Sequence, residues 1–250
     1  MIEKKDIIAD LHIHTISSEH AFSTLYECIR CASEAGLKYI AITDHYYNDG
    51  TEMHKKNEIN RFRFLEKEAA GTQMKVNVIG GAEFNIGQKI ESWEKLKNLR
   101  WKMIGVHGWS IKAKEMCLED IYKLYEQIAD DMDCFSHIER GLGKIGGCVE
   151  IGLTDEIKDY LCNIVALAKE KNVVLEVNES TLFSKKPGDY ERMNYWLKYA
   201  KSNGNLISIG SDSHYCESIG KFERTLDLLN NIDFPKNRVL NCNLELLKNI

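Results

Sequence analysis

Short apolar runs alternate along the chain with longer stretches in which apolar residues recur at helical spacing. The apolar runs predict seven buried strands, over residues 7–9, 39–43, 77–82, 103–106, 134–136, 173–177 and 206–210. The stretches between them predict helices, over residues 24–35, 118–129, 155–171 and 190–202, with the polar segment 57–70 as a further candidate. Strands that alternate with helices in this way are typical of an α/β protein with a parallel sheet.

The first predicted helix carries clear boundary signals. Thr24 can cap its amino terminus, and Gly36 follows as a stop at its carboxyl terminus. Cys28 and Cys31 lie inside this helix at a spacing that zinc sites also use. Because no second cysteine pair completes such a site, we expect both thiols to pack in the core.

Residues that can bind metal ions follow nearly every predicted strand. Seven of the eight histidines lie at or just after a strand end, and only His54 does not. These seven histidines, with two acidic residues at equivalent places, make up the set His12, His14, His20, His45, Glu83, His107, His137, Asp212 and His214. A single histidine in such a place is more often a hydrogen-bonded structural residue, but recurrence at successive strand ends indicates a metal site.

The first members of the set form a His-x-His pair. His12 and His14 are two residues apart, and side chains at that spacing in an extended segment point to the same side. The pair can therefore offer two nitrogen atoms to one metal ion. A strand end with two partly exposed histidines is the alternative interpretation of the pair taken alone.

The distribution of the candidate ligands distinguishes between two α/β architectures. An open doubly wound sheet gathers its ligands at one switch point between two strands. Here candidate ligands follow the first, second, third, fourth, fifth and seventh strands, and a closed barrel brings that many strand ends to one mouth. We therefore predict a seven-stranded (β/α) barrel with the site at the carboxyl ends of its strands. Residues 222–250 are expected to form helices that close over the barrel seam.

Length and composition fit one domain over residues 1–250. Hydrophobic residues make up 44% of the chain and charged residues 28%, without a low-complexity linker. No apolar run approaches the ~20 residues that span a bilayer, and the amino terminus lacks the apolar core of an export signal. We expect a cytoplasmic protein without a membrane partner, whose eight cysteines are reduced.

The charge of the chain argues against extended DNA or RNA as a partner. The formal net charge is -5, and no basic cluster offers a surface for a phosphate backbone. A homo-oligomer is compatible with the sequence.

Six short motifs carry the candidate ligands: DLHIHT at 10–15, ITDH at 42–45, GAE at 81–83, VH at 106–107, SH at 136–137 and GSDSH at 210–214. In this order they resemble the motifs of the PHP (polymerase and histidinol phosphatase) family of metal-dependent phosphoesterases. The spacing from His14 to His20, the Glu-Val-Asn strand and the Asp-Phe-Pro near Phe234 look closest to the stand-alone YcdX-type phosphatases of that family. The resemblance implies a distorted, TIM-like seven-stranded barrel that holds three zinc ions.

The resemblance also implies how the ligands are divided among three divalent ions. The first ion would be held by His12, His14, Glu83 and Asp212. The second would be held by His20, His45 and His214, and the third by Glu83, His107 and His137. Glu83 would then bridge two ions. Zinc is the expected metal, and iron or manganese can occupy similar sites.

Such a centre favours a small phosphorylated metabolite as substrate. Bound divalent ions lower the pKa of water to about 7 and stabilise charge on a leaving oxygen. The expected reaction is therefore hydrolysis of a phosphate monoester by metal-activated hydroxide. The alternatives are a phosphodiester or nucleotide substrate, histidinol phosphate as the substrate, and a non-catalytic metal-binding module of the kind that some DNA polymerases contain.

Residues outside the metal set are expected to select the substrate. We expect Arg140, three residues after His137, to act in catalysis with Glu83 and Asp212 by binding the substrate phosphate through its planar guanidinium. A solvated surface arginine is the alternative. Where related sequences often have His-Pro, this chain has His137 followed by Ile138, so the substrate of a relative does not transfer to it.

Other residues near the strand ends have two interpretations each. Lys185 and Lys186 could bind phosphate or lie in solvent. The aromatic residues that follow ligand positions could line the pocket or pack in the core, and they are Tyr46, Tyr47 and Trp109. Asp10 and Asp44 could orient neighbouring imidazoles or cap strand-to-loop turns.

Overall fold

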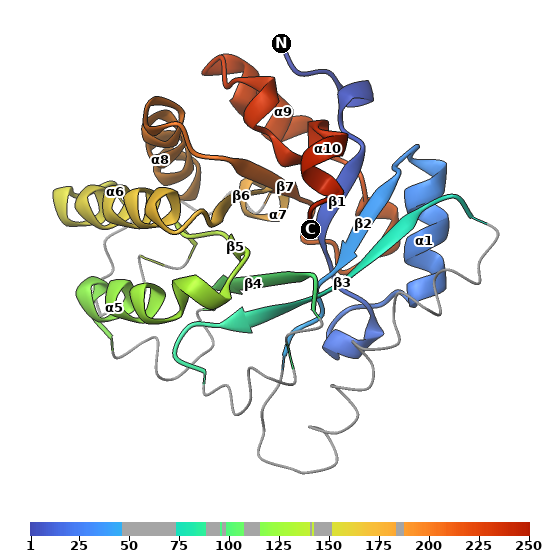
Figure 1. Ribbon diagram of the computed structural model, residues 1–250, viewed down its shortest axis with the longest axis horizontal. Helices are drawn as coiled ribbons and strands as arrows, with labels where there is room; N and C mark the ends of the chain where they lie inside the picture. Colours follow the sequence, from blue (N-terminus) through green and yellow to red (C-terminus); the bar gives the residue numbers. More distant parts are fainter. Residues whose placement is uncertain are drawn as a thin grey trace.

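Seven parallel strands form a nearly closed barrel with helices around it (Figure 1). The computed structural model describes residues 1–46, 74–88, 96, 99–107, 116–140, 142, 152–183 and 188–250. The strands neighbour one another in chain order, as β1 (Ala9–Ile13), β2 (Tyr39–Ile42), β3 (Asn77–Asn85), β4 (Trp101–Gly105), β5 (Cys134–Phe135), β6 (Val174–Asn178) and β7 (Ile207–Gly210). The predicted seven-stranded α/β barrel is confirmed.

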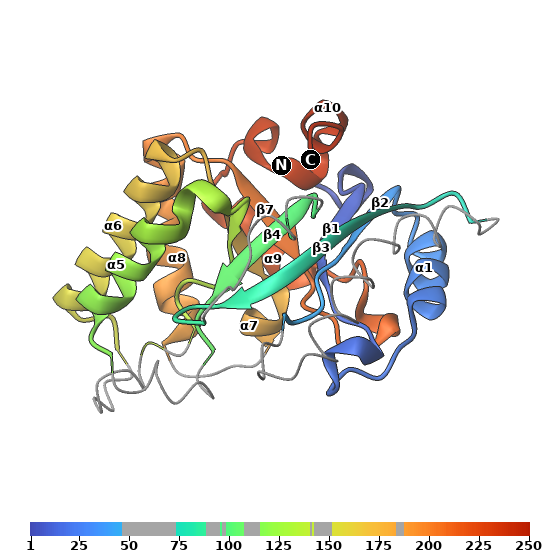
Figure 2. The ribbon, with the colours of Figure 1, turned by 60° about the horizontal axis from the view of Figure 1, so that its bottom comes forward.

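Helices lie around the outside of the strands (Figure 1). They are α1 (Leu25–Glu34), α5 (Leu118–Ile128), α6 (Asp155–Glu170), α7 (Glu179–Phe183), α8 (Asp189–Asn203), α9 (Glu223–Asn231) and α10 (Leu244–Leu247). Helices α5, α6 and α8 pack side by side on one flank, and α1 lies on the opposite flank in both views (Figures 1 and 2). Within the described residues, no helix combines the length and the apolar character needed to cross a membrane.

The helix predictions agree with the structure to within one or two residues. Thr24 caps α1 and forms a capping box with Glu27, and Gly36 follows the helix with a φ of 78°. Cys28 and Cys31 are buried in α1, as expected for thiols that pack in the core. The candidate helix over residues 57–70 lies outside the described residues.

The sequence pattern did not reveal the short helix α7, which follows β6 directly. Its first residue, Glu179, is buried, and its carboxylate accepts hydrogen bonds from the backbone N–H groups of Arg224 (3.2 Å) and Thr225 (2.9 Å). These two groups belong to the first turn of α9, where backbone N–H groups have no partner within the helix. Glu179 therefore joins α7 to α9.

Two predicted strand ends lie inside strands. His12 is part of β1, which begins at Ala9 rather than at residue 7, and Glu83 is part of β3. The first half of β3 pairs with β2, whereas its second half, from Gly81 to Asn85, pairs with β4. This stagger extends β3 beyond the end of β2 and leaves Glu83 beside His45, to which it forms an isolated parallel bridge. The prediction was wrong here because an apolar run stops at the first polar residue, whereas a barrel strand continues past it.

The barrel closes through a seam between β1 and β7. At the mouth, the N–H of His14 donates to the carbonyl of Ser213 (2.9 Å) and the N–H of Asp212 donates to the carbonyl of His12 (2.9 Å). Farther from the mouth, the side chain of Asn241, in the 3-10 helix η7 (Leu240–Cys242), lies between the strands. The prediction that the last segment closes the seam is confirmed.

Asn241 acts as a substitute for strand pairing. Its Nδ2 donates to the carbonyls of Ala9 (2.9 Å) and Ile209 (2.8 Å), and its Oδ1 accepts from the N–H of Ile209 (2.6 Å). The residue is fully buried, so water cannot replace these bonds. One amide side chain therefore satisfies backbone groups of both strands at the seam.

We expect Asn241→Ala to destabilise the protein. Each buried backbone group left without its partner costs about 1–3 kcal/mol, so the free energy of unfolding should fall by at least about 2 kcal/mol. Urea denaturation measures the change, with Asn163→Ala on the exposed face of α6 as the control. Equal unfolding free energies for the two variants would show that Asn241 does not hold the seam.

Candidate metal centre

The structure brings all nine predicted ligands into one contact network at the mouth of the barrel. Most lie in or just after a strand: His12 and His14 at β1, His45 at β2, Glu83 in β3, His107 after β4, His137 after β5, and Asp212 and His214 after β7. His20 follows the 3-10 helix η2 (Ile16–Ser18) and reaches the same place. His54, the one histidine excluded from the set, lies outside the described residues.

Glu83 lies at the centre of this network, and its two carboxylate oxygens face different histidines. Oε2 is 3.1 Å from Nδ1 of His45, 3.4 Å from Nε2 of His12 and 3.5 Å from Nε2 of His14. Oε1 is 2.9 Å from Nε2 of His137 and 3.3 Å from Nε2 of His107. The carboxylate therefore separates two groups of imidazoles and contacts both.

The hydrogen bonds of His12 and His14 determine which ring nitrogen carries a proton. Nδ1 of His12 is 2.6 Å from Oε1 of Glu176, and Nδ1 of His14 is 3.0 Å from Oγ of Ser18. The Ser18 hydroxyl donates to Asp44 at 2.6 Å, so its oxygen can only accept from His14. Both Nδ1 atoms therefore act as donors, and the Nε2 atoms are left to bind a cation.

The Nε2 atoms of His12 and His14 lie 2.9 Å apart. Two nitrogen lone pairs at this distance repel each other unless a proton or a metal ion lies between them. Zinc binds imidazole nitrogen at about 2.0–2.1 Å, so two nitrogens on one ion are separated by about 3 Å. Oδ1 of Asp212, 3.3 Å from Nε2 of His14, completes a group that fits one ion.

The electrostatic surroundings of His12 also favour a positive charge. Burial alone lowers the pKa of His12, but the carboxylates of Glu176, Glu83 and Asp212 outweigh it and raise that pKa well above its usual value. A bound metal ion would supply the positive charge that these carboxylates stabilise. The group His12, His14 and Asp212 therefore fits a metal ion both in geometry and in charge.

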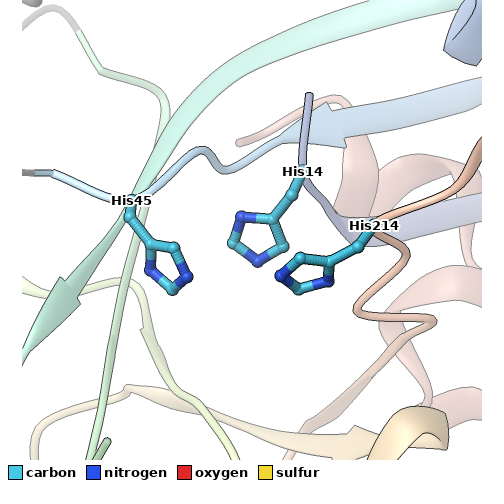
Figure 3. Close-up of side chains that lie close together, drawn as sticks. All are labelled: His14, His45 and His214. Carbon is cyan, nitrogen blue, oxygen red and sulfur yellow. The ribbon is translucent and has the colours of Figure 1, made fainter. Parts of the chain in front are cut away.

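Two further groups of three side chains have ligand atoms close enough for an ion. One consists of His14, His45 and His214, whose rings face one another in Figure 3, and the other of His45, Glu83 and His107. His20 joins the first of these groups through His214, because their Nε2 atoms are 2.8 Å apart. Neighbouring groups share His14 and His45, so the division of the ligands among individual ions stays a prediction.

The charge state of the centre suits metal binding. Burial alone raises the pKa of Glu83, but His107 and His12 outweigh it and hold that pKa well below the usual value. Burial lowers the pKa of His45 to about 2 and that of His214 to about 4. At neutral pH the carboxylate is ionised and these two imidazoles are neutral, which is the form in which each binds metal.

Oxygen acceptors around the centre orient further ligands. Nδ1 of His107 is 3.3 Å from Oδ1 of Asn85, and Nδ1 of His214 is 3.0 Å from the carbonyl oxygen of Asp212. Asp44 orients His14 through Ser18 and also accepts from the backbone N–H of Thr15 (2.7 Å) in the turn after β1, so its contacts fit both of its interpretations. Asp10 accepts from the backbone N–H groups of residues 211 and 220, so its contacts support the interpretation that it caps backbone turns.

The sequence pattern did not reveal three of these orienting residues. Glu176 lies in the middle of β6, and Ser18 and Asn85 lie beside ligand positions rather than at the ends of apolar runs. Glu176 alone left a signal, because a charged residue inside a buried apolar run requires a partner. Ser18 and Asn85 are common in turns, so their residue types gave no such signal.

The substrate candidates fall into three groups. Arg140 donates from one guanidinium nitrogen to Oδ2 of Asp212 at 2.8 Å and remains 30% exposed at the rim of the centre. Tyr46 is buried and its ring lies 5.1 Å from that of Phe84, so it packs in the core. Tyr47, Trp109, Lys185 and Lys186 lie outside the described residues.

Comparison with known proteins places the fold and the motifs in one family. A family model described as PHP domain matches residues 10–180. The chain is similar to a probable phosphatase from Proteus mirabilis, with 30% identity over 93% of this chain and 89% of that protein. It is also similar to a probable phosphatase from Shewanella loihica, with 27% identity over 94% of this chain and 89% of that protein.

A solved structure shares the fold. Histidinol phosphate phosphatase from Lactococcus lactis, crystallised with zinc, L-histidinol and phosphate, superposes with a TM-score of 0.64 over 92% of this chain and 95% of that chain. The sequence identity is 20%, so the likeness concerns the fold.

We expect Gly105→Ala to disturb the centre. A Cβ at this position would lie 2.5 Å from Cε1 of His137 and 2.5 Å from Oγ of Ser136. Overpacking of this kind typically costs about 1–3 kcal/mol, and here it would also displace a predicted ligand. Urea denaturation should show a lower free energy of unfolding, and zinc titration should show weaker zinc binding. Gly152→Ala is the control, because its Cβ would have no atom within 4 Å; equal behaviour of the two variants would contradict the prediction.

Proposed function

Because the chain belongs to the PHP domain family and is a phosphoric ester hydrolase, we propose that it hydrolyses a small phosphate monoester at a centre of three divalent metal ions. The observation that carries this proposal is that imidazole nitrogens and two carboxylates converge at one place. They present more lone pairs than there are N–H groups to pair with them by hydrogen bonds. Three compact groups of side chains support the number of ions. Zinc is the first choice because the set is rich in imidazole, with iron or manganese as alternatives.

The ligands proposed for the three ions are the nine predicted side chains. The two oxygens of Glu83 face opposite groups of histidines, which supports its role as a bridge. When bound, divalent ions supply an activated water and stabilise the charge that develops on the leaving oxygen. The side chains of the chain would position these ions. Buried histidines form one side of the centre, and the open side faces solvent at His20 and His214.

Arg140 is proposed to bind the substrate phosphate. Its bond to Asp212 fixes the guanidinium beside the centre while part of the side chain stays exposed. Guanidinium groups bind two phosphate oxygens through parallel N–H donors, which adds orientation to affinity. A phosphate held on the ions near Asp212 would therefore meet a preorganised donor.

Other substrates lead to different expectations for the same centre. A phosphodiester or a nucleotide needs room for a second organic group at phosphorus, and histidinol phosphate needs groups that recognise its imidazole and amine. The Lactococcus lactis phosphatase was crystallised with L-histidinol, but its 20% identity to this chain carries the fold alone. A non-catalytic module would keep the metals without turnover.

The proposal predicts metal-dependent hydrolysis of a simple monoester. 4-Nitrophenyl phosphate should be hydrolysed at least tenfold faster than bis(4-nitrophenyl) phosphate. Removal of metal by a chelator should abolish the activity, and zinc or manganese should restore it. Metal analysis of the active protein should give close to three ions per chain.

The other outcomes of this assay have separate meanings. Faster hydrolysis of the diester would favour a phosphodiesterase. Bound metal without turnover of either ester would favour the non-catalytic module, and one ion or fewer after remetallation would exclude the trinuclear centre.

We expect Arg140→Ala to lower kcat/KM for the monoester by roughly tenfold to a hundredfold, which corresponds to losing a charge-assisted bond of ~1.5–3 kcal/mol. Arg140→Lys should also be impaired, because an ammonium group cannot reproduce the planar pair of donors. Metal content should not change, since arginine offers no lone pair to a cation. Arg30→Ala on the exposed face of α1 is the control, and parental kinetics in both Arg140 variants would remove Arg140 from the site.

A further inference from the structure

Strand β6 differs from the other six strands of the barrel. Each of the others carries at least one of the nine proposed ligands, in the strand or in the described residues that follow it, whereas β6 carries none. What β6 brings to the centre is Glu176, in the middle of the strand and 1% exposed. A buried carboxylate is costly unless it is paired, so its partners indicate its role.

The first partner of Glu176 is His12 on β1. Oε1 of Glu176 lies 2.6 Å from Nδ1 of His12, and both side chains are completely buried. A carboxylate can only accept, so Nδ1 of His12 must carry the proton. Nε2, which faces His14, Glu83 and Asp212, is then the atom left to bind a cation.

The second partner is the backbone of His137, after β5. Oε2 of Glu176 accepts from the N–H of His137 at 3.1 Å and from Nδ2 of Asn178 at 3.2 Å. His137 has a φ of 30°, in the left-handed region that residues with a Cβ disfavour. The bond from Glu176 therefore supports an unfavourable backbone conformation that aims the imidazole at Glu83.

The strand on the other side of Glu176 leaves room for these contacts. A Cβ at Gly210, in β7, would overlap Oε1 of Glu176 and would lie 2.5 Å from Cβ of His12. Only glycine fits at this position while Glu176 stays in contact with His12. The pairing of β6 with β7, which places Asn178 opposite Gly210, brings this gap beside the carboxylate.

We propose that Glu176 is a positioning residue of the centre: it holds His12 in the tautomer that binds metal and holds His137 in the backbone conformation that directs its ring inward. The inference rests on the proposed metal centre. It explains why a barrel strand without a ligand carries a buried acid, since that acid connects β1 and β5 across the barrel. Partners of this kind commonly change metal affinity by 10- to 100-fold when they are removed.

The test compares Glu176→Gln and Glu176→Ala with the parent protein. Glutamine keeps the shape but offers one oxygen, so it cannot accept from both His12 and His137. In both Glu176 variants, the zinc affinity of one metal-binding site should fall by 10- to 100-fold. Competition with a chromophoric chelator measures this affinity. Glu179→Gln is the matched control, because Glu179 is also buried but bonds to the backbone of α9.

A second measurement separates positioning from a general loss of structure. In the parent, proton NMR of protein labelled with ¹⁵N-histidine should show a downfield, slowly exchanging Nδ1 proton on His12, with or without zinc. This proton should exchange rapidly in Glu176→Ala and should be unchanged in Glu179→Gln. If Glu176 had only a structural role, Glu176→Ala and Glu179→Gln would both lower stability, and the exchange of the His12 Nδ1 proton would not distinguish them.

Two results would overturn the inference. One is zinc affinity in both Glu176 variants within threefold of the parent. The other is a protected Nδ1 proton on His12 that survives Glu176→Ala. A parent protein that binds zinc and shows the proton but hydrolyses no phosphate ester would refute the proposed function and leave the role of Glu176 intact. If the parent binds no zinc, the protection of the His12 Nδ1 proton in the parent and its loss in Glu176→Ala still test whether Glu176 holds His12.

Discussion

The structure depends on a cluster of mostly buried nitrogen and oxygen atoms that face one another with too few protons to pair them all by hydrogen bonds. Nδ1 of His12, His14, His107 and His214 each faces an oxygen acceptor, so the Nε2 atoms point at one another and at two ionised carboxylates. Burying that many lone pairs without a partner would cost several kcal/mol. A metal cation would satisfy several of them at once, and the rest of the mouth keeps them in place.

The barrel makes this convergence possible because closure fixes every strand end relative to the others. A shift of one residue in the pairing of a strand moves its side chains to the opposite face. The seam between β1 and β7 is therefore critical, since His12 and Asp212 hydrogen bond across it through their backbones. Glycine at positions 105 and 210 has a related effect, because a side chain at either one would occupy space that a ligand or its partner needs.

The sequence predicted the barrel and the nine candidate ligands because both depend on a repeated local pattern, an apolar run followed by a histidine or an acid. It misplaced His12 and Glu83, which lie inside strands, because the stagger of β3 against β2 and β4 is a property of the closed sheet. It missed the role of Glu176, because the partners of that residue, His12 and His137, lie far away in the chain. The seam was expected, but its dependence on Asn241 follows from three-dimensional contacts alone.

Exposure divides the centre into a fixed side and an open side. His12, His14 and His137 are almost completely buried, whereas the side chains of His214 and Arg140 are 29% and 30% exposed and His20 lies in solvent. Asp212 joins the two sides, because its Oδ1 lies 3.3 Å from Nε2 of the buried His14 while its Oδ2 accepts from the exposed Arg140 at 2.8 Å. Under the proposed function, a phosphate ester that approaches from solvent would meet Arg140 and the outer histidines before the buried ligands. Metal ions bind the phosphate of different esters in similar ways, so under the proposed function discrimination among esters would come from the groups around this open rim.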